Sequence, residues 1–155
     1  MSTVFKKLNL KDQEEILILN APASFEPEIK SLRKVKVQRG LQGAKTITFS
    51  LAFVTKQKEL DRIARSVSRK AKGDAIVWFA YPKKTSRNFE CEFNRDTGWA
   101  VLGEAGFEGV RMVAIDEDWS ALRFRRVEFI KTMTREKKRT MTSEGRKKAA
   151  ARLSR

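Results

Sequence analysis

The chain has 155 residues, 41% of them hydrophobic, which suits one domain with a real core and leaves little room for two. Its 34 Lys and Arg outnumber 19 Asp and Glu, and a net charge of +15 favours a polyanionic partner, nucleic acid ahead of an anionic membrane, over solubility alone. The absence of histidine excludes His-based triads and the commonest zinc ligand, and the single Cys91 excludes a disulfide within the chain, so no metal site is expected.

The same features predict a cytoplasmic protein. A single cysteine suits a reducing compartment, and "MSTVFKKLNL" lacks the apolar stretch of a signal peptide. No apolar run approaches the length that spans a bilayer, so we expect a soluble chain with no membrane partner.

The first half of the chain predicts strands and helices in alternation. Ile16 to Leu19 form a continuous apolar run, typical of a strand that is covered on both faces. Residues 25–32 predict a short helix with Pro27 in its first turn, where proline is tolerated. Residues 35–38 and 45–54 then predict two further strands.

The second half continues the alternation. Thr55 is expected to cap a helix over 56–72 with an apolar stripe at helical spacing, and Gly73 to end it. Residues 74–82 predict a buried strand, 92–105 a helix closed by Gly106, and 109–115 another strand. After the turn "DEDWS", residues 121–129 alternate apolar and basic side chains, as in an antiparallel edge strand.

This order predicts an α/β fold: a three-layer sandwich with a mostly parallel sheet, helices on both faces and a C-terminal antiparallel hairpin. We place the domain at residues 1–130. Residues 131–155 form a basic tail, disordered or helical, with too few large apolar side chains to build a core. Ten basic residues and two acids give the tail a net charge of +8; the basic residues are Lys131, Arg135, Lys137, Lys138, Arg139, Arg146, Lys147, Lys148, Arg152 and Arg155.

Four segments together resemble a known family. "KLNLKDQEEILILNAP", "LAFVTKQKEL", "IVWFAYPKK" and "GFEGVRMVAIDEDWSALRFRR" are similar, in order and spacing, to small bacterial proteins classed as domain of unknown function three thousand and fifty-two. The likeness covers most of residues 6–127. It implies a Rossmann-like fold related to methyltransferases, whose sheets finish with a comparable hairpin, and it implies no activity.

Ligands of open α/β sheets bind outside the carboxyl ends of the parallel strands. The residues expected at that edge are Asn20, Ala21, Lys83, Lys84, Asp116, Trp119 and Ser120. The lysines can hold a phosphate or belong to a solvated loop, and Asp116 can accept from a ribose or cap the turn. Trp119 can stack on a base or cover the sheet edge.

The loop after the first strand argues against the usual cofactors of this fold. A glycine-rich turn lets the backbone approach a phosphate, whereas "NAPASF" carries side chains throughout and Pro22 lacks an amide donor. Arg39 and Gly40 follow the second strand where an acidic residue would be expected. We therefore predict no cofactor and no catalytic residue.

Three functions remain. The first is a non-catalytic module that binds nucleic acid or a ribonucleoprotein through its tail without strong sequence specificity. Basic residues of the domain can extend that surface: Arg65, Arg69, Lys70, Lys72, Arg123, Arg125 and Arg126. The second is a binder of an adenosine- or nucleotide-type ligand, or a divergent methyltransferase-like enzyme, that uses the strand-end residues. The third is an interaction module that docks on an acidic protein.

Overall fold

The computed structural model describes residues 2–130, so the ten cations of the tail lie outside the described residues. The helices and strands follow the chain in the order α1 (Thr3–Lys7), β1 (Glu15–Leu19), α2 (Glu26–Lys30), β2 (Lys36–Gln38), β3 (Ile47–Phe53), α3 (Gln57–Lys70), β4 (Ala71–Pro82), α4 (Ala100–Glu104), β5 (Phe107–Ala114) and β6 (Trp119–Arg126). Within these residues no helix is both long and apolar enough to cross a bilayer.

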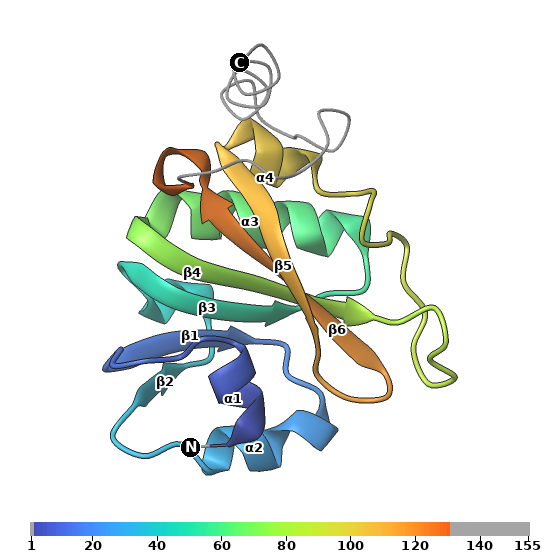
Figure 1. The fold of residues 1–155 in the computed structure, drawn as a ribbon, viewed down its shortest axis with the longest axis horizontal. Coiled ribbons are helices and arrows are strands. Elements are labelled where there is room, and N and C mark those ends of the chain that lie inside the picture. Colours follow the sequence, from blue (N-terminus) through green and yellow to red (C-terminus); the bar gives the residue numbers. More distant parts are fainter. Residues whose placement is uncertain (1, 131–155) are drawn as a thin grey trace, which may run out of the picture.

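The strands form one sheet in the order β2-β1-β3-β4-β6-β5 (Figure 1). Strands β1 to β4 pair in parallel, and β6 runs antiparallel to both β4 and β5. The α/β architecture predicted from the sequence, a mostly parallel sheet with a C-terminal antiparallel hairpin, is therefore confirmed.

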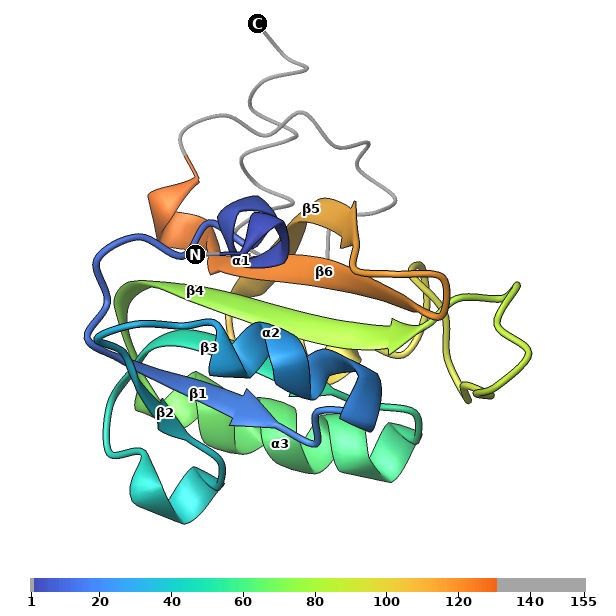
Figure 2. The ribbon, with the colours of Figure 1, turned by 90° about the horizontal axis from the view of Figure 1, so that it is seen from below.

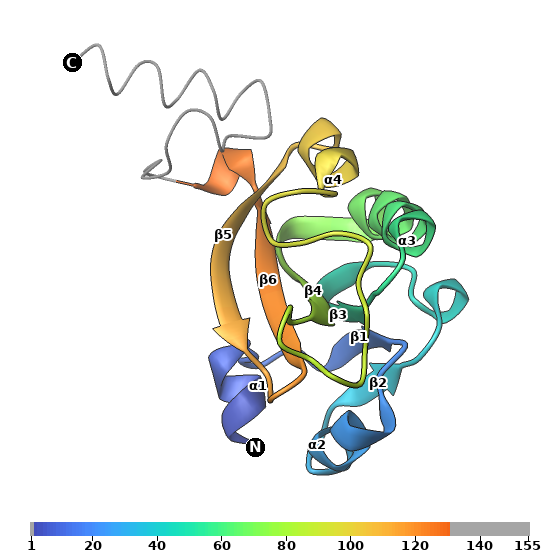
Figure 3. The ribbon, with the colours of Figure 1, turned by 90° about the vertical axis from the view of Figure 1, so that its right-hand side faces the viewer.

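Each face of the sheet carries its own core. Apolar residues of α3 and α4 pack on one face together with Phe79 and Phe124. Residues of α1 and α2 pack on the other face around Trp78. Figure 1 has α1 in front of the strands and α3 behind them, and Figures 2 and 3 show α1 and α3 on opposite sides of the sheet. The three layers explain why β1, β3 and β4 are apolar without alternation.

Helix α3 differs at both ends from the prediction. It begins at Gln57 and ends at Lys70, and its N-cap is Lys56 with no side-chain cap. Thr55 donates its backbone N–H to Glu59 Oε1 (3.2 Å) instead of capping the helix. Gly73, expected to close the helix, has φ of 59° and lies in β4, because the chain leaves the helix directly into an extended strand.

Two further predictions are wrong. The helix over 92–105 is reduced to α4, Ala100–Glu104, because Asn94 and Gly98 close a turn before it. The last strand, β6, is not at the edge: it lies between β4 and β5, so β5 is the edge strand. An interior place for β6 means that charge on this strand does not protect a sheet edge.

The sequence reading missed α1, which the structure ties to the sheet. Ser2 accepts the Phe5 N–H at the start of the helix (3.4 Å). Trp78, fully buried in β4, donates its Nε1–H to the carbonyl oxygen of Leu8 (2.8 Å). The tryptophan therefore anchors the chain after α1 to the middle of the sheet.

Candidate functional site

The carboxyl ends of β1 and β3 form the switch point of the sheet, where a nucleotide would bind in an open α/β fold. Asn20 spans it: its Nδ2 donates to the Phe53 carbonyl oxygen and to Glu59 Oε2, both at 3.3 Å. Asn20 itself adopts φ of 58°, a left-handed conformation that asparagine tolerates. Hydrogen bonds within the chain thus join the two strand ends.

Aromatic rings fill the same edge on the face of α1 and α2. Phe53 lies 5.0 Å from the ring of Phe25 and 5.1 Å from that of Trp119, and Phe89 lies 4.9 Å from Trp119. Trp119 is only 3% exposed, so its ring covers the sheet edge and offers no open face to a base.

Asp116 caps the turn between β5 and β6. Asp116 Oδ1 accepts the N–H groups of Asp118 (2.8 Å) and Trp119 (2.9 Å), which is the turn geometry of an aspartate. The Lys83 N–H donates to the Asp118 carbonyl oxygen (2.7 Å), so the loop after β4 and this turn meet as predicted from topology.

A cleft of about 970 Å³ opens beside that meeting point. It lies between the end of β4, the loop 83–97 and strands β5 and β6, and Lys83, Lys84 and Ser120 line it. Asn20, Ala21, Asp116 and Trp119 do not. The seven residues predicted for one site therefore divide between the switch point, the turn and the cleft.

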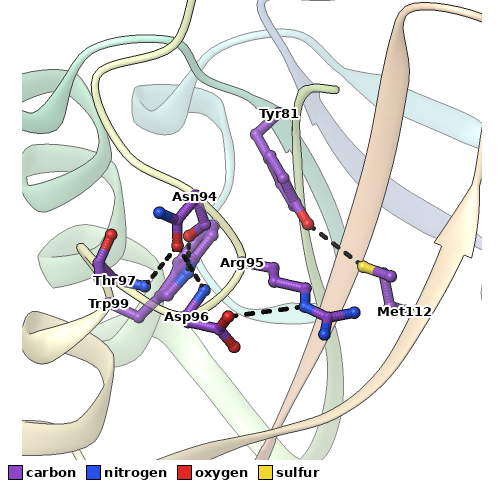
Figure 4. A network of polar contacts seen from close by, with 7 residues as sticks. All are labelled: Tyr81, Asn94, Arg95, Asp96, Thr97, Trp99 and Met112. Carbon is purple, nitrogen blue, oxygen red and sulfur yellow. Dashed lines mark hydrogen bonds and ion pairs between the residues drawn. The ribbon is translucent and has the colours of Figure 1, made fainter. Parts of the chain in front are cut away.

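The wall of the cleft is a hydrogen-bonded loop (Figure 4). Asn94 Oδ1 accepts the N–H groups of Asp96 (2.8 Å) and Thr97 (3.0 Å), and Trp99 Nε1–H donates to the Asn94 carbonyl oxygen (2.8 Å). Arg95 pairs with Asp96 across 3.7 Å. The loop is therefore held by its own side chains and backbone.

Two titratable groups of the cleft favour their neutral forms. Burial raises the pKa of the Tyr81 hydroxyl, which donates to Met112 Sδ (3.2 Å) in Figure 4. Burial likewise raises the pKa of the Cys91 thiol, so the nucleophilic thiolate is disfavoured near neutral pH. Among residues 2–130, no group of three metal-ligating side chains comes together.

The structure also sorts the basic residues of the domain. Lys70 donates its Nζ to the Leu41 carbonyl oxygen, and Arg125 makes two hydrogen bonds with Asp74 (2.8 and 2.6 Å). Arg126 donates to the carbonyl oxygens of Ser68 and Ala71 and lies 4.9 Å from the ring centre of Phe107. Three of the seven domain cations expected to extend a nucleic-acid surface are therefore engaged within the fold.

The other basic residues expected on the nucleic-acid surface include exposed cations on α3 and just after it, and two further exposed cations of α3 were not predicted. Lys58 and Arg62 continue a row of exposed residues through Arg65 and Arg69 to Lys72. Steps of four, three and four residues place the first four cations on one side of the helix axis, and Lys72 follows at the start of β4. The helical spacing in the sequence was the signal that would have found this row, which we call the α3 stripe.

Neither a protein-family model nor a curated protein sequence matches the chain. Solved structures do resemble it. A SAM dependent methyltransferase from Aquifex aeolicus is 16% identical, with a TM-score of 0.57 over 80% of this chain and 88% of that one. The N-methyltransferase NodS from Bradyrhizobium japonicum WM9 is 13% identical, with a TM-score of 0.52 over 80% and 93% of the two chains. The chain therefore has the Rossmann-like fold of methyltransferases.

That fold implies S-adenosylmethionine, and the switch point of this chain does not fit it. Asn20 joins β1 to β3, and the buried rings of Phe25, Phe53 and Trp119 pack along the same edge. A cofactor would have to displace hydrogen bonds that already satisfy the Phe53 carbonyl and the Glu59 carboxylate.

Proposed function

We propose that the chain is a non-catalytic protein with a methyltransferase-like fold that binds nucleic acid, or a ribonucleoprotein, through basic surfaces. The observation that carries the proposal is the α3 stripe. Helix α3 buries Leu60, Ile63, Ala64 and Val67 against the sheet and leaves the stripe in solvent. A polyanion is the partner that such a surface suits.

The cations of the stripe are not held in ion pairs within the described residues. No ion pair found in residues 2–130 includes any of its five cations. The two acids of α3 bond elsewhere, Glu59 to Asn20 and Asp61 to Gln57. From Lys58 to Arg69 the stripe extends about 16 Å along the helix, so its cations can contact several successive phosphates.

The same proposal includes the ten cations of the tail, which supply further phosphate contacts without base readout. A non-catalytic role is supported by the bridged switch point, the raised pKa of the Cys91 thiol and a sequence without histidine. A cytoplasmic location and membership in the bacterial family that the sequence resembles belong to the proposal as well.

Removal of residues 131–155 tests whether the tail contributes to nucleic-acid binding. We expect the chain cut after Ile130 to bind a fluorescent mixed-sequence duplex, or an RNA of the same sequence, more weakly than the full chain. The slope of log affinity against log salt falls by up to about 9 if all ten cations neutralise phosphates of a duplex. Anisotropy titrations at several salt concentrations measure both quantities.

Equal affinity and equal slope for the two forms would remove the tail from the proposal. The third interpretation, an acidic protein partner, gives a different result: a polyglutamate peptide then binds the full chain and is not displaced by duplex at equal charge concentration.

The cleft supports a second candidate, a binder of an adenosine- or nucleotide-type ligand or a divergent methyltransferase-like enzyme. Lys83 and Lys84 line it as potential phosphate contacts, beside the partly exposed Met112. These features favour an anion attached to an apolar group.

Cys91 reports on this candidate because it lines the cleft and is the only cysteine of the sequence. Its raised pKa means that alkylation at neutral pH is slower than for an exposed free cysteine. If the cleft binds adenosine monophosphate or S-adenosylmethionine, millimolar ligand slows the alkylation further and saturably. In a Lys83→Gln, Lys84→Gln variant, adenosine monophosphate should no longer protect Cys91 from alkylation, because the lysines that would contact its phosphate are gone. A rate independent of both compounds excludes them as ligands of the cleft.

A further inference from the structure

Two arginines face each other across the C-terminal hairpin. In the register of β5 and β6, Arg111 lies directly opposite Arg123. Residues directly opposite in an antiparallel pair have Cβ atoms about 5 Å apart, and like charges there are destabilising. The pairing is therefore unfavourable in the protein alone.

No ion pair found in residues 2–130 includes Arg111 or Arg123. Arg125, the next residue on the same face of β6, is bound by Asp74 (2.6 Å) and lies opposite Glu108. Acids thus flank Arg125, whereas Arg123 has Trp78 opposite it on β4 and Arg111 opposite it on β5. The cation without an acidic partner across the strands is Arg123.

Arg123 also has a buried donor without an acceptor. Its side chain is partly buried, and its Nε has no hydrogen-bond partner among residues 2–130. Burial, and then Arg125 and Arg111, lower the pKa of its guanidinium, and Asp74 offsets part of that effect. A buried donor of this kind is costly unless a ligand completes it.

We propose that Arg111 and Arg123 form a binding site for one phosphate group of a nucleic acid. Two arginines directly opposite each other can bring both guanidinium groups to the oxygens of a single phosphate, and the bound anion removes the repulsion between them. The inference rests on the proposed function and extends it. The site lies on the sheet face of Trp78, α1 and α2, whereas α3 covers the other face (Figure 3). The protein therefore contacts nucleic acid on both faces of its sheet.

The test uses the full chain, a fluorescent mixed-sequence duplex and the variants Arg111→Gln, Arg123→Gln and both together. Arg33→Gln is the matched control, since Arg33 is exposed between α2 and β2 and its loss changes the net charge equally. We expect each hairpin variant to bind about tenfold more weakly than the control, with a salt slope smaller by about 0.9. Because both arginines hold one phosphate, the double variant should lose less than the product of the two single losses.

Thermal unfolding without nucleic acid supplies the second readout. Removal of one of two like charges should leave the melting temperature of Arg111→Gln unchanged or higher than that of the starting protein. A melting temperature several degrees lower would make the arginine structural and overturn the inference.

If the hairpin variants bind the duplex as well as Arg33→Gln does, the phosphate site of Arg111 and Arg123 is also ruled out. The proposed function is still supported in that case if a variant of the α3 stripe binds the duplex weakly. Loss of polyglutamate binding with unchanged duplex binding would assign the pair to an acidic protein instead. If stripe and hairpin variants all bind like the starting protein, the proposed function falls as well.

Discussion

Replacement of the α3 stripe by glutamine is expected to reduce the salt dependence of duplex binding by about 4.5 in the slope of log affinity against log salt. The five changes are Lys58→Gln, Arg62→Gln, Arg65→Gln, Arg69→Gln and Lys72→Gln. Each cation is exposed and none belongs to an ion pair found in residues 2–130, so each can neutralise one phosphate at about 0.9 in slope. Titrations between low and moderate salt measure the slope directly.

A matched control separates the stripe from net charge. Glutamine at five other exposed cations lowers the charge equally but leaves α3 intact: Lys6, Lys7, Lys11, Arg33 and Lys36. The control should keep most of its slope. If both variants lose the same affinity and slope, the partner responds to overall charge and α3 is not the contact surface.

Trp78→Ala is expected to cost about 4 kcal/mol of unfolding free energy. It leaves a large cavity in the core and removes the hydrogen-bond donor to the Leu8 carbonyl oxygen. Trp78 is fully buried and donates to Leu8 O (2.8 Å), which holds the segment after α1. Domains of this size are stable by about 5–15 kcal/mol, so the variant approaches the limit of folding. Urea denaturation followed by circular dichroism measures the loss.

Two variants calibrate that result. Trp78→Phe keeps most of the ring and loses the hydrogen bond, so it should cost about 1–3 kcal/mol. Met112→Ala removes a side chain that is 45% exposed and should cost much less than Trp78→Ala. A loss below about 1 kcal/mol for Trp78→Ala would contradict the anchoring role of the tryptophan.

Most strands were predictable because their signal is local. The apolar runs that became β1, β3 and β4 are covered by helices on both faces, and that burial requires continuous apolar residues. The prediction of a helix over 92–105 was wrong. The composition of this segment is compatible with a helix, but the Asn94 turn and Gly98, with φ of 96°, interrupt it.

The candidate site was predictable only as a location. Topology brought the loop after β4 to the β5–β6 turn, where Lys83 meets Asp118. It did not reveal that Asn20 would bond to Phe53 and Glu59, since those partners are 33 and 39 residues away. Nor did it reveal which side of β4 would carry the cleft.

The fold class, the α/β alternation and the strong positive charge could be predicted from the amino-acid sequence, because they depend on composition and on periodicity within short segments. Which cations are available to a partner depends instead on long-range contacts. Arg125 and Arg126 are engaged by Asp74 and by the carbonyls of Ser68 and Ala71, while Arg123 lies opposite Arg111. The reason is physical: strand order and register bring together residues far apart in the chain, and those contacts determine whether a charge is paired or free.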